Sequence, residues 1–274
     1  MAATSVLSLV LLLMVGMQDQ MSRAWTNANR RTEATREARA GLRMLTEDFI
    51  HYYIRDVLTN AGPARANYNP STSPIAMVYF SNAAATNGGL SILGARTNSQ
   101  ALFFLSQRRP GTNSPTPDQL TAVGYYIASD PRGSTNINGM ISYNYHLYRY
   151  VNTNILPAFP NPTPARLFTN VGPTFPSNNE VLTCNAVDLR IYFYPATSVP
   201  TTGLIYRLDE ASSSPTNIYS GNRCVFELVC YPETVANTIL QAGSNMSAWT
   251  NSGNLKRYAR TFETSMDLER SLAK

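Results

Sequence analysis

The chain has 274 residues, enough for one large domain or for a domain with an extended appendage. Charged residues make up only 14% of it, against roughly 25% in an ordinary soluble domain, and Asn, Thr and Ser supply the polarity instead. The 43% of hydrophobic residues and the 16 tyrosines exclude a globally disordered chain. This composition is typical of short strands joined by long polar loops, as in surface and secreted proteins.

The net charge of +5 does not indicate a nucleic-acid-binding protein. Basic patches that bind phosphate backbones are usually clustered on one face. Here no run of four or more basic residues occurs, and Lys256 and Lys274 are the only lysines. The arginines of the first 108 positions are interspersed with acids. We therefore expect no nucleic-acid partner.

The N-terminal stretch, residues 2–17, contains no charged side chain. It is shorter than the span of about 20 apolar residues that usually crosses a membrane, and it lacks the positive start and the cleavage site of a secretory signal peptide. We expect its apolar side chains to lie in a bilayer or in the core of a filament. They are Val6, Leu7, Leu9, Val10, Leu11, Leu12, Leu13, Met14 and Met17.

A helical sequence follows this stretch without a break. From Gln18 to Leu58 there is no proline and a single glycine, and strong helix formers dominate, up to a terminator at residues 60–63. We predict one continuous helix of roughly 55 residues, about 80 Å long. Apolar residues at steps of three and four predict the face that holds the head. They are Ala34, Ala38, Leu42, Leu45 and Phe49.

Beyond Pro63 the chain changes to segments rich in β-branched and aromatic residues, which predict strands. These segments are 78–80, 101–105, 123–127, 146–151, 187–194, 224–230 and 258–266. Long polar loops are expected at 108–117, 155–179 and 197–222, and a short helix at 232–241. The sequence therefore predicts an α+β protein. Its helix, residues 1–60, packs on the antiparallel or mixed sheet of one head domain, residues 64–274.

Sequence motifs for catalysis are missing. The chain has no GxSxG, HExxH or P-loop sequence, and its two histidines, His51 and His146, have no nucleophile motif nearby. The scattered acids give no support to a hydrolase. We expect no catalytic residue, no cofactor and no bound metal, and we interpret the chain as a protein that is not an enzyme.

Three cysteines leave at least one without a partner in the chain. Cys224 and Cys230 at the two ends of one strand are about 20 Å apart, too far for a bond between them. Cys184 could meet either of the other two, and we take Cys184 with Cys230 as the candidate disulfide. Strand alternation points these two thiols to opposite faces, so the bond requires a bulge.

Two segments of the long helix, 17–25 and 31–40, resemble type IV pilins and type II secretion pseudopilins, in particular the larger minor pseudopilins of the J or W type. They are most similar to the pilin-like "cassette C" proteins of Verrucomicrobia. Segments at 100–104, 122–126, 145–149 and 182–190 are more loosely similar. The family's leader, cleavage-site Gly, Phe-Thr-Leu and Glu are missing, and Met1 aligns just after that Glu. We expect a clipped N-terminus, or alternatively a leaderless variant.

The resemblance implies a single-pass subunit of the bacterial inner membrane with its head in the periplasm. Such a subunit is assembled into, or at the tip of, a type IV pilus or a type II secretion-like filament. The expected partners are other pilin-like subunits, bound through the N-terminal helix, inner-membrane lipid before assembly, and the assembly machinery. The alternative is a membrane-tethered adhesin or binding module that does not polymerise, to which aromatic, Asn-rich loops are suited.

Overall fold

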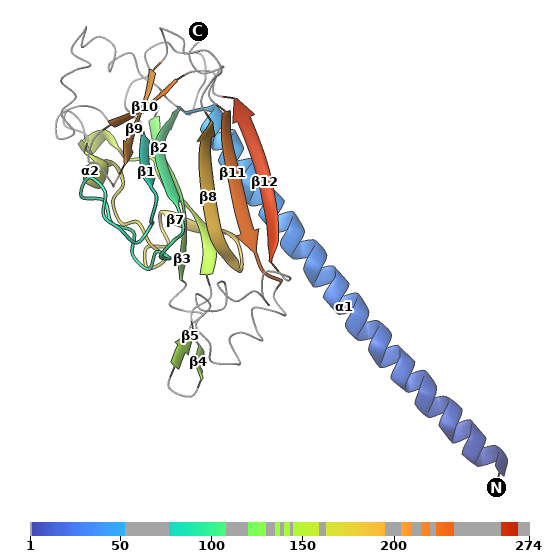
Figure 1. The fold of residues 1–274 in the computed structure, drawn as a ribbon. Coiled ribbons are helices and arrows are strands. Elements are labelled where there is room, and N and C mark those ends of the chain that lie inside the picture. Colours follow the sequence, from blue (N-terminus) through green and yellow to red (C-terminus); the bar gives the residue numbers. More distant parts are fainter. Residues whose placement is uncertain are drawn as a thin grey trace, which may run out of the picture.

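The protein is α+β, with one long helix that projects from a head built on two main sheets (Figure 1). This computed structural model describes residues 2–52, 77–107, 120–129, 135–137, 140–142, 145–158, 163–194, 204–209, 215–219, 223–232 and 259–267.

The helix α1 spans Ala2–Ile50 without interruption. The predicted end at residues 60–63 was placed too late, because His51 already lies in a turn. Tyr52 donates its backbone N–H to the carbonyl of Phe49 and forms a bridge with Ser106. Pairing with the head therefore overrides the helix propensity of the sequence at this point. Residues 53–76 lie outside the described part of the chain.

The larger sheet has seven strands in the order β10-β9-β1-β2-β3-β6-β7. Their bounds are Pro215–Tyr219, Leu204–Asp209, Met77–Phe80, Ala101–Gln107, Leu120–Ser129, Tyr145–Asn152 and Asn179–Thr183, in that order. Strands β1 and β9 pair in parallel and the other neighbours are antiparallel, so the sheet is mixed.

The smaller sheet has the order β12-β11-β8 and is antiparallel throughout. Its strands span Arg260–Asp267, Arg223–Cys230 and Ala186–Tyr194. A separate hairpin pairs β4 (Thr135–Ile137) with β5 (Met140–Ser142). Strand β12 runs beside α1 in Figure 1, at the edge of its sheet.

Each of the seven segments that we predicted as strands coincides with a strand, namely β1, β2, β3, β6, β8, β11 and β12. The predicted loop 155–179 instead contains a 3-10 turn, Leu156–Ala158, and the short helix α2, Pro164–Leu167. The predicted loop 197–222 contains β9 and β10. The predicted loop 108–117 and residues 233–241 of the predicted short helix lie outside the described residues.

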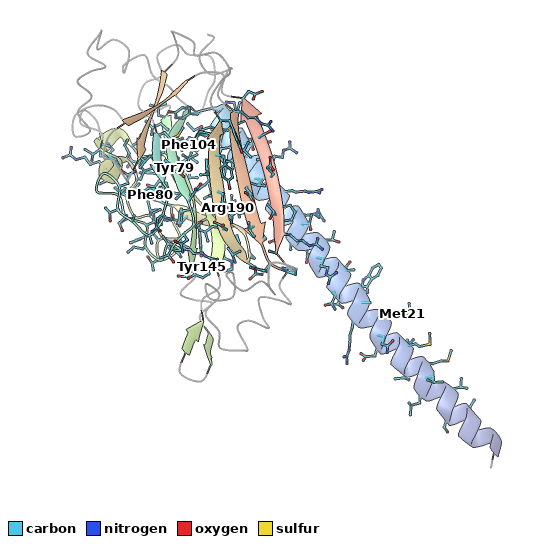
Figure 2. The ribbon with its side chains drawn as sticks, viewed as in Figure 1. Met21, Tyr79, Phe80, Phe104, Tyr145 and Arg190 are labelled. Atoms are coloured by element: carbon cyan, nitrogen blue, oxygen red, sulfur yellow. The ribbon has the colours of Figure 1, made fainter. Side chains whose placement is uncertain are left out.

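Two hydrophobic cores lie on opposite faces of the larger sheet. In the first, Leu42, Leu45 and Phe49 of α1 pack with side chains of both sheets, such as Phe104 and Phe226. The ring of Phe49 meets the rings of Phe104 and Phe226 edge to face, with centroids 5.0 and 5.5 Å apart. The second core lies beneath the segments 81–95, 155–158 and 163–171. Figure 2 labels Tyr79 and Phe104 of the first core and Phe80 of the second.

Candidate assembly surface on the helix

Helix α1 has two halves in contrasting environments. Every described side chain from residue 7 to residue 29 is exposed, whereas from Ala38 onward one face is buried in the head. At 1.5 Å per residue, the exposed half is on the order of 35 Å long. We call residues 7–29 the free segment; it projects from the head in Figure 1.

The free segment carries large apolar side chains in contact with solvent. Leu12 is 76% exposed and Trp25 is 71% exposed; Figure 2 shows Met21 on the same segment. Of the residues predicted to enter a membrane or filament core, those with described side chains are all exposed. They are Leu7, Val10, Leu11, Leu12, Leu13, Met14 and Met17. The side chains of Val6 and Leu9 lie outside the described part of the structure.

A seam at steps of three and four runs along α1 and is apolar on both sides of Arg31 and Thr35, which occupy its steps between Ala28 and Ala38. Its free part contains Leu7, Val10, Met14, Met17 and Met21, followed by Ala24 and Ala28. The same steps lead to the buried residues Ala38, Leu42, Leu45, Phe49 and Tyr52. Alternating steps of three and four are the pattern of helices that pack against a second helix. The head covers one part of the seam and leaves the other part open.

The predicted head-packing residues lie together on the covered part. Ala38, Leu42, Leu45 and Phe49 are buried in the first core, and Ala34 is half-buried at its border.

Among the residues that the structure describes, no helix combines the length and the apolar character that crossing a membrane requires.

A charged junction fixes the end of the helix to the head. Arg149 of β6 donates from Nε to Asp48 Oδ2 at 2.7 Å, from Nη2 to Asp48 Oδ1 at 3.1 Å, and from Nη1 to Glu180 Oε1 at 2.7 Å. Tyr125 donates its hydroxyl to the same carboxylate of Asp48. Burial alone would lower the pKa of Arg149, but the hydrogen bonds to Asp48 and Glu180 outweigh burial and raise that pKa. The arginine therefore stays charged.

About two helical turns before Asp48, the backbone of α1 comes close to the head at Gly41. Gly41 is buried, and a Cβ at this position would stand 2.7 Å from Thr183 Oγ1. That hydroxyl donates to the carbonyl of Glu37 at 3.3 Å. The sequence did contain a signal for this contact, because Gly41 is the only glycine between residues 18 and 58.

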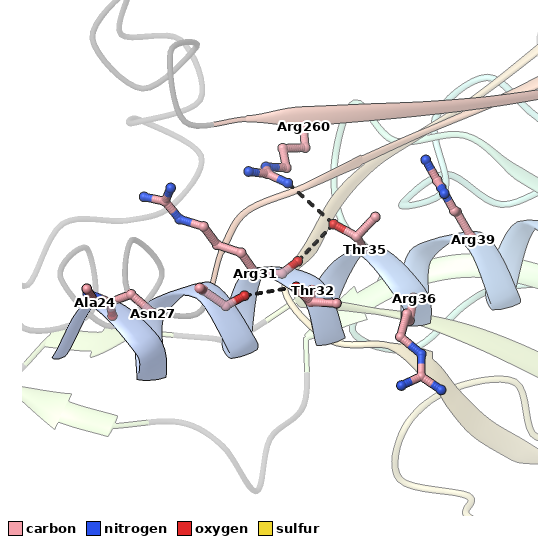
Figure 3. A pocket seen from close by; sticks show the side chains of 9 residues that line it. Ala24, Asn27, Arg31, Thr32, Thr35, Arg36, Arg39 and Arg260 are labelled. Carbon is pink, nitrogen blue, oxygen red and sulfur yellow. Dashed lines mark hydrogen bonds between the residues drawn. The ribbon is translucent and has the colours of Figure 1, made fainter. Parts of the chain in front are cut away.

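A groove of about 690 Å³ lies between α1 and β12, where the helix leaves the head (Figure 3). Arg260 of β12 donates from Nη1 to Thr35 Oγ1 at 3.3 Å across it. Figure 3 shows Arg31 and Arg39 extending to the side on which Arg260 lies, and Arg36 pointing away from it. The lining residues, which we call the arginine groove, are Ala24, Asn27, Ala28, Arg31, Thr32, Thr35, Arg36, Arg39 and Arg260.

The groove is positively charged and its charges are not neutralised from within the described structure. Arg31, Arg36 and Arg39 are exposed, and none of them forms an ion pair with a described residue. Arg36 is three residues after Glu33 on α1 but forms no ion pair with it, whereas Arg43 pairs with Glu47 at 2.8 Å. Sequence reasoning missed this groove because β12 lies more than two hundred residues from α1 in the chain.

The remaining candidates do not assemble into a chemical site. Cys184, Cys224 and Cys230 are all present as thiols, so the candidate disulfide of Cys184 with Cys230 is not formed. The bulge that such a bond required is there, as a register shift between Val229 and Cys230, but Cys184 is exposed while Cys230 is buried.

The two histidines lie apart from each other. His51 is exposed just after α1, and His146 Nδ1 accepts a hydrogen bond from the backbone N–H of Asn185 at 3.4 Å. Within the described ranges, no group of three or more His, Cys, Asp or Glu side chains lies close enough together to hold a metal ion.

Comparisons of the chain with protein-family models, with curated proteins and with solved structures find no match. The class of protein that the fold defines is thus an α+β head on a long helix whose apolar half is exposed. The exposed apolar half of α1 is the feature of this fold that bears on function.

Proposed function

We propose that the chain is a structural subunit of a pilin-like filament, of the type IV pilus or type II secretion kind. In this proposal the free segment and the residues before it anchor the chain in the bacterial inner membrane, with the head in the periplasm. During assembly the same helix leaves the lipid and packs against copies or homologues. The role is structural and not enzymatic.

The observation that carries the proposal is the exposed apolar run from Leu7 to Met17, extended by Met21 and Trp25. Burying one large apolar side chain contributes about 1.5–3 kcal/mol, so leaving this run in water costs on the order of 10 kcal/mol. Lipid tails or a neighbouring helix remove that cost. The seam at steps of three and four gives the free segment one face that can pack against a neighbouring helix, and the exposed apolar side chains outside the seam, such as Leu12 and Trp25, can contact lipid.

Membrane anchoring is tested by a charge in the apolar run. In Leu12→Arg the most exposed apolar side chain is replaced by a guanidinium, which costs about 2.5–3.5 kcal/mol at the centre of a membrane helix. We expect the variant to leave the membrane fraction after alkaline extraction of cells, and Leu11→Arg to behave in the same way. Gln20→Arg, at an exposed polar position of the same helix, is the matched control and should stay in the membrane. Unchanged partitioning of Leu12→Arg would overturn the anchoring role.

Assembly is tested separately, because a membrane-tethered adhesin that never polymerises would also be retained by the membrane. Met21→Cys introduces a thiol on the open part of the seam, in a chain whose exposed thiol has been removed by Cys184→Ser. When this cysteine carries a thiol-reactive photo-crosslinker, which can capture any nearby residue of a neighbouring copy, we expect crosslinks between two differently tagged copies in the cells that express the chain. Membrane retention without any crosslink through the free segment would favour the tethered binding module.

A further inference from the structure

We propose that the arginine groove is a docking site for carboxylates of a second copy of this chain, namely Glu33 and Glu37 on the opposite side of its α1. This inference rests on the proposed function and adds the contact that would orient neighbouring subunits.

The two charged sides of α1 follow from helix geometry. Glu33 is two residues after Arg31, and Glu37 is two residues before Arg39. Two residues correspond to about 200° around an α-helix, so each glutamate lies nearly opposite its arginine. All four side chains are exposed. Where α1 leaves the head, it therefore has a basic side facing β12. Glu33 and Glu37 lie on the opposite side, at the same helix face as Arg30. This side adjoins the turn between β7 and β8, where Glu37 accepts a weak hydrogen bond of 3.4 Å from the backbone N–H of Cys184.

The arginine side has both the charge and the room for a carboxylate-bearing helix. Arg31, Arg39 and Arg260 line a groove of about 690 Å³ and lie on one side of α1 in Figure 3. Ala24 and Ala28 form its floor on the helix, and small residues of this kind let a second helix approach closely. Guanidinium groups bind carboxylates through paired hydrogen bonds, which fix the orientation as well as the contact.

The two sides are different, so the contact that they make is heterologous. The basic side of one copy meets the side of the next that carries Glu33 and Glu37, and the outer sides of the pair remain open for further copies. Such contacts generate rings or open filaments and do not stop at a dimer. A second copy is thus the occupant that brings two exposed carboxylates, Glu33 and Glu37, to the arginine groove.

Charge reversal tests this contact, with the Met21→Cys crosslink between tagged copies as the readout. The variant Arg31→Glu/Arg39→Glu places acid against acid, and Glu33→Arg/Glu37→Arg places base against base. We expect each variant alone to lower the crosslink yield about tenfold, because two attractive pairs become two repulsive ones. Expressed together, the two variants complement each other, and the crosslink between them returns.

Matched controls separate this effect from damage to the fold. Arg166→Glu/Arg223→Glu has the same change in net charge, and neither of its residues lines the groove. We expect the wild-type crosslink yield from it. Thermal unfolding of each charge-reversal variant is followed by circular dichroism, and recovery in the mixed pair shows that both variants are folded.

The glutamate variant distinguishes a second copy from a phosphate-bearing partner. An anionic lipid or a nucleic acid on the arginines would bind Glu33→Arg/Glu37→Arg as well as or better than the wild type, since two positive charges are added. An undiminished crosslink in that variant, or failure of the mixed pair to recover, overturns the proposed docking site. If the wild type itself gives no Met21→Cys crosslink, the filament proposal fails instead.

Discussion

Arg149 and Asp48 are joined by two hydrogen bonds, 2.7 and 3.1 Å long, although Asp48 lies on α1 and Arg149 on β6, beside the edge strand β7 of the larger sheet. A third hydrogen bond from the same guanidinium reaches Glu180 of β7. One side chain thus connects the helix to two neighbouring strands. Since the described side chains of the free segment are all exposed, the direction in which it leaves the head depends on contacts such as this one.

The first prediction concerns this junction. In Arg149→Met the carboxylate of Asp48 loses two charged hydrogen bonds in a half-buried setting. Hydrogen bonds to charged groups contribute about 1.5–3 kcal/mol, and a buried charge left without its partner adds a desolvation cost. We expect the free energy of unfolding to fall by about 2–3 kcal/mol, measured by urea denaturation. The control is Arg43→Met, which breaks the exposed pair with Glu47 and should cost less than about 0.5 kcal/mol. Equal losses in the two variants would contradict the prediction.

The second prediction concerns the close approach at Gly41. In Gly41→Ala the new methyl group would stand 2.7 Å from the hydroxyl of Thr183, which is buried. Overpacking of this kind costs about 1–3 kcal/mol. That loss exceeds the gain in helix propensity, which is at most about 1 kcal/mol. We expect Gly41→Ala to lower the melting temperature. In the double variant Gly41→Ala/Thr183→Ala, the loss of stability should be smaller than the sum of the two single losses, because Thr183→Ala removes the hydroxyl with which the new methyl group clashes.

Gly16→Ala is the matched control for Gly41→Ala. No atom lies within 4 Å of a Cβ built at Gly16, so only the gain in helix propensity remains. We expect equal or higher helix content by circular dichroism. A destabilised Gly16→Ala would show that helix context, and not the contact with Thr183, sets the cost at Gly41.

The main elements of the fold were predictable where the local pattern is strong. Val187, Leu189 and Ile191 alternate with polar residues and lie buried on β8. The strands β9 and β10 were missed because the segment around them is rich in Pro, Ser and Thr. The residues of β9, Leu-Ile-Tyr-Arg-Leu-Asp, do carry a strand pattern, and β9 pairs with β10 nearby in the chain as well as with the distant β1.

The candidate site was predictable in part for the same physical reason. The apolar run and the packing face of α1 are local patterns, and the sequence contains both. The arginine groove requires Arg260 to meet Thr35, and the junction requires Arg149 to meet Asp48, at separations of 225 and 101 residues. Such contacts depend on the sheet order, which no local spacing specifies.

The third prediction concerns the reactivity of the thiols. Cys184 is exposed, whereas Cys224 and Cys230 are buried. Burial, together with the nearby charges of Glu37 and Cys184, raises the pKa of Cys230 to about 12, so this thiol stays protonated and unreactive at mildly alkaline pH. We expect a thiol reagent to label one cysteine of the folded chain and three after denaturation. Cys184→Ser should abolish labelling of the folded chain. Fast labelling of the folded Cys184→Ser variant would contradict the burial of the other two.

The fourth prediction concerns stability at alkaline pH. Burial raises the pKa of Tyr52, of Tyr126 and of Tyr125, and the charge of Asp48 adds to the effect at Tyr125. A phenol in the unfolded chain has a pKa of about 10. Above that pH the unfolded state loses protons that the native state retains, so the free energy of unfolding falls as pH rises. The slope is about 1.4 kcal/mol per pH unit for each buried phenol. We expect phenolate absorbance of these residues to appear together with the loss of circular dichroism.

Two substitutions separate the tyrosines that cause this decline. The hydroxyl of Tyr52 is buried and has no hydrogen-bond partner among the described residues. Tyr52→Phe should therefore leave stability at neutral pH unchanged or raise it, while the alkaline slope becomes shallower by one group. Tyr125→Phe also makes the slope shallower, but it removes the hydrogen bond to Asp48 and should lower stability at neutral pH. If the phenols ionise while the circular dichroism of the native state persists, water has access to them and burial is not what holds their protons.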